Sequence, residues 1–157
     1  LDDTASLGAL LQSVAEAGMR DASAADLLAA NNAPFEPART KFDWLSRDGS
    51  EVDAYLADPY CGDQHPLTYS YFAGIAEIVA PAVTGLGAIT SPIYVIAGDR
   101  DPAAGMGAFP AALADRLAGA GVDTTLRIYA DARHELLNET NRDEVTADLV
   151  AWLDARI

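Results

Sequence analysis

The sequence predicts an α/β fold in which a mostly helical first part, residues 1–88, precedes a β-α-β-α unit over residues 89–157. Two apolar runs predict the strands of this unit. Residues 93–97 (IYVIA) form a continuous apolar run, which is typical of a strand buried on both faces. Residues 124–129 (TTLRIY) form the second run, and an Ala- and Leu-rich helical stretch over 105–120 separates the two. A strand, a crossover helix and a second strand build a parallel pair.

The other predicted helices follow from apolar spacing and from capping residues, and they cover residues 4–18, 23–30, 50–56, about 68–83 and 141–156. Ser23 and Ser50 are the predicted caps of the second and third of these helices. Residues 31–49 show little periodicity, so we expect an ordered loop there, anchored by its aromatic and leucine side chains. Because two parallel strands need further strands and cover on both faces, we expect most of the sheet to lie in another segment.

Composition excludes several classes of function. The net charge is −14, which argues against a nucleic-acid partner because phosphate binding needs clustered Lys and Arg. Cys61 is the only cysteine, so no intrachain disulfide can form and a thiolate metal site is not expected. The acidic residues do not follow the spacing of a known metal-binding loop. We therefore expect neither a metal nor a cofactor.

Ionisable residues follow both predicted strands. Asp99 and Asp101 lie in the turn after the first strand, in GDRDP, and His134 lies in the loop after the second, in ADARHELLNE. Because neighbouring parallel strands lie about 4.8 Å apart, their loops can bring a carboxylate and the imidazole into hydrogen-bond contact. Such a carboxylate orients the imidazole, whose other nitrogen can then act as a base. Each residue could also be an ordinary turn or loop residue, as such residues usually are.

Three longer stretches of the sequence are informative together: GDRDP, ARHELLNETNRDEV and RTKFDWLSRDGSEVDAYLADPYCG. They resemble the C-terminal part of α/β-hydrolases, and the resemblance runs from about Asn31 onward. The similarity is to the bacterial monoacylglycerol lipase and lysophospholipase branch, which is related to the serine aminopeptidases. It implies a helical lid and connecting loop over residues 1–67, followed by a C-terminal core segment over 68–157 that holds the last two core strands.

The same resemblance implies that Asp101 is the acid and His134 the base of a catalytic triad, with Asp99 as the second choice of acid. It also implies that Asn138 and Glu139 brace the histidine loop or cap the last helix. Asp101 precedes His134 in the chain, which fits the Ser…Asp…His order of the fold.

The nucleophile that such a triad needs is absent from the sequence. No serine lies in the motif G-x-S-x-G, and no His-Gly oxyanion loop is present. By the layout of the family, the first core strands and the serine would precede Leu1. Cys61 could replace the serine by residue type, although a small packed side chain is the more common role of such a cysteine.

We therefore expect the C-terminal portion of a serine hydrolase that cleaves carboxylic esters of lipid-like substrates through an acyl-enzyme. Its partners would be a small ester substrate and the N-terminal half of the same hydrolase, and a homo-oligomer is compatible with the sequence. His65, Tyr69 and Phe72 are the expected substrate-binding residues. Two alternatives stay open, a non-catalytic interaction module and a degenerate hydrolase that lacks a nucleophile.

Overall fold

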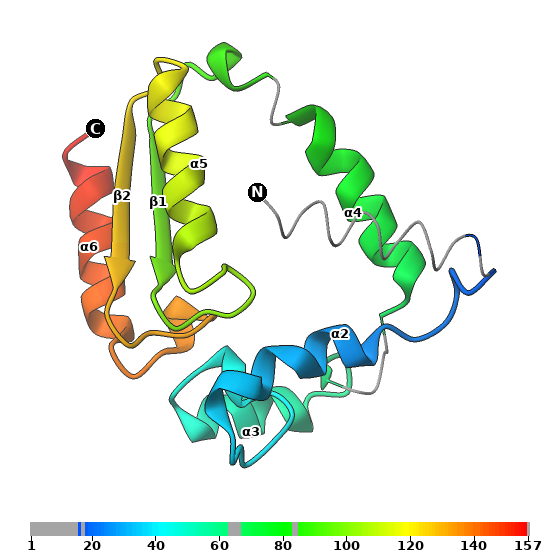
Figure 1. Cartoon of the computed structure of the whole chain (residues 1–157). Helices are drawn as coiled ribbons and strands as arrows, with labels where there is room; N and C mark the ends of the chain where they lie inside the picture. Colours follow the sequence, from blue (N-terminus) through cyan, green and yellow to red (C-terminus); the bar gives the residue numbers. More distant parts are fainter. Residues whose placement is uncertain (1–15, 17, 63–66, 83–84, 157) are drawn as a thin grey trace.

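The computed structural model describes residues 16, 18–62, 67–82 and 85–156. The predicted helix over 4–18 therefore lies almost entirely outside the described residues, and His65 lies outside them as well. Within the described part, the order of the longer elements is α2 (Ala25–Ala29), α3 (Gly49–Ala57), α4 (Tyr69–Ala82), β1 (Ile93–Gly98), α5 (Ala108–Gly119), β2 (Thr124–Tyr129) and α6 (Arg142–Asp154) (Figure 1). Four short 310-helical turns in the described part of the chain connect them, among them η1 (Ala30–Phe35), η2 (Asp43–Leu45) and η5 (Leu136–Asn138).

The β-α-β-α unit is confirmed. β1 and β2 are parallel, with Ile93 opposite Thr124 and Gly98 opposite Tyr129, so both strands end at the same edge. Figure 1 shows α5 and α6 on opposite sides of the strand pair. Trp152 of α6 stacks on Tyr94 of β1, with ring centroids 5.2 Å apart, and this contact fixes α6 against one face. The loops that leave the carboxyl ends of both strands therefore meet below the pair.

The expectation that the first strand is buried on both faces is wrong for most of β1. Its first four residues are half-buried, and only its last two, Ala97 and Gly98, are buried. Leu126 of β2 is exposed. The reason is that the described residues form a sheet of two strands, in which each strand has a neighbour on one side only.

The loop over residues 31–49 is ordered by an apolar cluster, as expected. Phe42, Trp44, Leu45 and Val52 form this cluster, with Phe35 packed against it. A second cluster lies where α6 meets the ends of the strands, and it consists of Tyr129, Ala132, Leu136 and Val145.

The predicted cap of α3 is wrong by two residues. Asp48 is the N-cap, and its carboxylate accepts a hydrogen bond from the Ser50 amide at 3.0 Å. The Asp48 carboxylate can accept this bond and also pair with Arg142 of α6 at 2.7 Å, whereas a serine hydroxyl could not form the ion pair. No helix in the described part of the chain is long and apolar enough to span a membrane.

Candidate active site

The carboxyl ends of β1 and β2 bring Asp101 and His134 into contact. Nδ1 of His134 lies 2.9 Å from Oδ2 of Asp101, so the predicted contact between the two side chains is confirmed. Gly98 at the end of β1 makes this possible, because its missing side chain lets the backbone of Ala132 and Arg133 pack directly on the strand end. The amide of Arg100 donates to the carbonyl oxygen of Ala132 at 3.0 Å and ties the two loops together.

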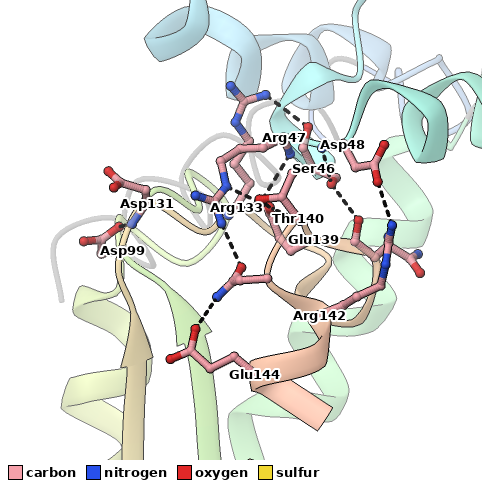
Figure 2. A network of polar contacts seen from close by, with 12 residues as sticks. Ser46, Arg47, Asp48, Asp99, Asp131, Arg133, Glu139, Thr140, Arg142 and Glu144 are labelled. Carbon is pink, nitrogen blue, oxygen red and sulfur yellow. Dashed lines mark hydrogen bonds and ion pairs between the residues drawn. The ribbon is translucent and has the colours of Figure 1, made fainter. Parts of the chain in front are cut away.

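The geometry distinguishes the two candidate acids. Asp101 is 5 % exposed and its Oδ1 accepts a hydrogen bond from the amide of Ala103 at 2.9 Å, which orients the carboxylate toward the imidazole. Asp99 instead accepts a hydrogen bond from the amide of Asp131 at 2.7 Å (Figure 2). Asp131 has a φ of 59°, in the left-handed region that favours glycine, and this bond supports that conformation. Asp99 thus holds the loop, and Asp101 contacts the imidazole of His134.

The imidazole of His134 is held on two sides and open on a third. Its ring packs against Trp44 with ring centroids 4.9 Å apart. Its side chain is 42 % exposed, whereas that of Asp101 is 7 % exposed. The hydrogen bond to Asp101 raises the pKa of His134 above its ordinary value, and burial, which lowers the pKa, only partly offsets this. Because Nδ1 is engaged by the carboxylate, Nε2 is the nitrogen that can exchange a proton with a reactant.

Neither the position of Cys61 nor the pKa of its thiol is that of an activated nucleophile. Burial raises the pKa of its thiol, and the charges of Asp58 and Glu135 raise it further. A reactive cysteine needs the opposite shift, since the thiolate is the attacking species. The residue is half-buried and, together with Leu28 and Phe42, lines a cavity of about 330 Å³ between α2 and α3.

Tyr69 and Phe72 lie in the first turn of α4, which Figure 1 shows well separated from the carboxyl ends of the strands. The ring of Phe72 packs edge-on against Tyr71, with centroids 5.5 Å apart. The structure thus does not bring these two residues to the Asp101–His134 pair, and their role in substrate binding stays a prediction. Among the described residues, no group of three or more His, Cys, Asp or Glu side chains is arranged to hold a metal ion.

Sequence reasoning missed the residues of the segment 43–48 that surround the histidine loop. Arg47 pairs with Glu139 at 2.8 Å, and Ser46 donates to the carbonyl oxygen of Asn138 at 2.8 Å (Figure 2). The partners are about 92 positions apart in the sequence, so no local pattern could pair them. The one available signal was the presence of both stretches in the family resemblance.

Comparison with known sequences shows the family of the chain. The family described as "Serine aminopeptidase, S33" matches residues 6–141. The chain belongs to this family. A monoacylglycerol lipase of Mycolicibacterium smegmatis is 32 % identical over 122 residues, which are 71 % of this chain and 38 % of that protein.

Solved structures show the same fold, that of the α/β-hydrolases. A thermostable carboxyl esterase from Bacillus coagulans, in complex with glycerol, superposes with a TM-score of 0.80 at 22 % identity and covers 96 % of this chain. A lipase in an open form gives a TM-score of 0.63 at 26 % identity and covers 88 % of the chain. The chain spans 52 % and 55 % of those two structures and thus corresponds to about half of each. This member of the serine aminopeptidase family therefore has part of the α/β-hydrolase fold.

Proposed function

We propose that the chain is the C-terminal portion of a serine hydrolase that cleaves carboxylic esters of lipid-like substrates, and that Asp101 and His134 are its acid and base. The observation that carries the proposal is the 2.9 Å contact between a buried carboxylate and a partly exposed imidazole at the ends of two parallel strands. In open α/β sheets this edge is where ligands bind.

The chemistry follows from the two protonation sites of His134. Nε2 takes the proton of a serine hydroxyl as its oxygen attacks the ester carbonyl, and the Asp101 carboxylate stabilises the imidazolium that forms. The imidazolium then protonates the leaving alcohol. Water attacks the resulting acyl-enzyme with the same base assisting, and the carboxylic acid leaves. Backbone amides stabilise the negative oxygen in both steps.

In this proposal the serine and the oxyanion amides come from an N-terminal segment that is not in the sequence. Two facts support this assignment: no serine of the chain lies in G-x-S-x-G, and the chain spans 38 % of the M. smegmatis relative. Large apolar side chains that the rest of an α/β-hydrolase could cover are exposed on α4 and α5, among them Ile75, Ile78, Phe109 and Leu113. Residues 1–67 would act as the lid and 68–157 as part of the core.

The substrate class rests on the name of the M. smegmatis relative, a monoacylglycerol lipase. We propose a monoacylglycerol or a lysophospholipid, each of which joins one acyl chain to a polar alcohol. His65, Tyr69 and Phe72 would contact this substrate from the lid and from the start of α4. No cofactor is required by the chemistry, because the nucleophile, acid and base are all side chains.

A fluorophosphonate probe, which labels an activated serine, tests the proposal. The probe is applied to the chain alone and to the product of the longest reading frame that contains it. We expect labelling of the longer product only, and a loss of at least about a hundredfold in labelling rate with His134→Ala. A reading frame without a glycine-flanked serine, or labelling that does not depend on His134, would refute the proposal and favour a binding module or a degenerate hydrolase.

A further inference from the structure

A buried carboxylate outside the Asp101–His134 pair holds the loop that carries His134. Glu139 is fully buried, and its two oxygens accept hydrogen bonds from four donors within 3.1 Å. These donors are the amide of Arg133 at 2.9 Å, the amide and Nε of Arg47 at 3.1 and 2.8 Å, and the amide of Thr140 at 2.9 Å (Figure 2). We propose that Glu139, paired with Arg47, is a positioning residue that sets where His134 stands. This inference rests on the proposed function.

The hydrogen bonds of Glu139 act on the residue directly before the base. Arg133 is held twice, because its amide donates to Glu139 and its guanidinium donates to the carbonyl oxygens of Asp43 and, at 3.1 Å, of Ser46. On the other side of the base, the amide of Glu135 donates to the carbonyl oxygen of Leu45 at 2.8 Å. Both neighbours of His134 are therefore anchored to one element, residues 43–48, which we call the brace segment.

The brace segment also touches the imidazole itself through Trp44. Arg47 is the residue that links this segment to Glu139, and its side chain is 28 % exposed while that of Glu139 is 0 % exposed. A displacement of the brace segment would therefore move Trp44, Arg133 and Glu135 together. Small displacements of a catalytic group have large effects on rate, since the reacting atoms must stay within hydrogen-bond reach.

Electrostatics indicates that the carboxylate is held in its charged form. Burial alone would raise the pKa of Glu139, but the hydrogen bonds from the Arg133 amide, the Arg47 side chain and the amides of Thr140 and Arg47 outweigh it, so the pKa lies below its ordinary value. Buried ion pairs add little to stability compared with apolar pairs of the same size. An ion pair whose carboxylate is fully buried and accepts four hydrogen bonds, and which joins two segments more than 90 residues apart, is thus better explained by the geometry that it enforces.

The test measures the pKa of His134 by NMR in the full chain, with His65→Asn as the background so that a single imidazole remains. The hydrogen bond to Asp101 is the main cause of the raised pKa of His134, so any loss of position lowers that pKa toward its ordinary value. Glu139→Gln and Arg47→Gln remove charges of opposite sign. Direct electrostatics would lower the pKa with the first and raise it with the second, whereas lost positioning lowers it with both.

We expect both variants to lower the pKa of His134 and to raise the exchange rate of the Arg133 amide by about tenfold or more, which corresponds to the loss of one charge-assisted hydrogen bond. Asp53→Asn is the matched control, since it removes an exposed ion pair with Arg39 and should change neither quantity. Glu135→Gln removes a charge that raises the pKa of His134 but has no bond to the Arg133 amide, so it should lower the pKa alone.

The wild-type chain supplies a readout if a variant does not fold. The amides of Arg47, Arg133 and Thr140 all donate to Glu139 and should exchange with one shared opening free energy. Opposite pKa changes in the two Gln variants, or free exchange of the Arg133 amide in the wild type, would overturn the inference. Neither readout needs the serine, so a failure here is separate from a failure of the proposed hydrolase activity.

Discussion

Replacing Gly98 with alanine tests how closely the end of β1 supports the histidine loop. A Cβ atom at Gly98 would lie 2.0 Å from the carbonyl oxygen of Ala132 and 2.6 Å from that of Arg133. Ordinary contact begins at 3.4 Å, so the loop would have to move by about 1.4 Å, the difference between 3.4 and 2.0 Å. The neighbours are backbone atoms, which cannot escape by a change of rotamer.

The cost has two parts. Overpacking of this kind costs about 1–3 kcal/mol. Displacing Ala132 also breaks the hydrogen bond from the Arg100 amide, which is worth about 1 kcal/mol. We therefore expect Gly98→Ala to lower the free energy of unfolding by about 2–4 kcal/mol. At a site that accepts alanine without strain, the same substitution raises the free energy of unfolding by about 0.4–1 kcal/mol, because it reduces the entropy of the unfolded chain. The expected loss at Gly98 is well above this gain.

Urea unfolding measures the free energy, and NMR of the His134 imidazole reports whether its contact with Asp101 survives. Gly74→Ala is the control, because a Cβ at Gly74 in α4 meets nothing within 4 Å, so it should raise the free energy of unfolding by about 0.5–1 kcal/mol. A Gly98→Ala chain whose unfolding free energy stays within about 0.5 kcal/mol of the wild type, with an unchanged His134 signal, would refute the reasoning.

Three further changes test the site and its supports. Asp101→Asn should lower the pKa of His134, because it weakens the hydrogen bond and removes the charge that raise this pKa. The stabilisation from the pair is complete below the ordinary pKa of histidine and is lost as the pH rises through the raised value. The wild type should therefore melt at a higher temperature than the variant at low pH, and this difference should shrink as the pH rises. Hydrogen bonds and ion pairing lower the pKa of Asp48 to about 2, so the stability that its carboxylate adds is present above about pH 3.8 and is lost as the pH falls through about 2. The melting temperatures of the wild type and of Asp48→Asn, which still caps α3, should therefore converge over this pH range. A constant difference between them would contradict this prediction. Tyr129→Phe removes the 3.1 Å hydrogen bond to Asp148 and should cost about 0.5–1.5 kcal/mol in urea unfolding, and no loss would mean that this bond contributes nothing.

Local patterns were sufficient to predict the β-α-β-α unit. The second strand was predicted at residues 124–129 and is found there, because a short run of β-branched and aromatic residues has few alternatives. The prediction failed where a neighbour decides the outcome, as with the cap of α3. Both Asp48 and Ser50 are good caps, and the ion pair with Arg142, a residue of α6, accompanies the choice of Asp48.

The candidate pair itself was predictable because parallel strands place their carboxyl ends at one edge, whatever the rest of the molecule does. The choice between the two aspartates was implied only by the family resemblance. Within three residues of one turn, the direction of each side chain depends on which amides bind it: the Ala103 amide orients Asp101 toward the imidazole, and the Asp131 amide holds Asp99 away from it.

The sequence by itself determined the class of fold, the order of Asp101 and His134 along the chain, and the absence of a glycine-flanked serine, since these depend on periodicity, chain order and residue type. The family resemblance implied that Glu139 braces the histidine loop, but only the tertiary structure decided which residues Glu139 binds. Arg47 and Glu139 meet across 92 positions of the chain. Such a pairing is set by the packing of whole elements, and a local pattern cannot encode it.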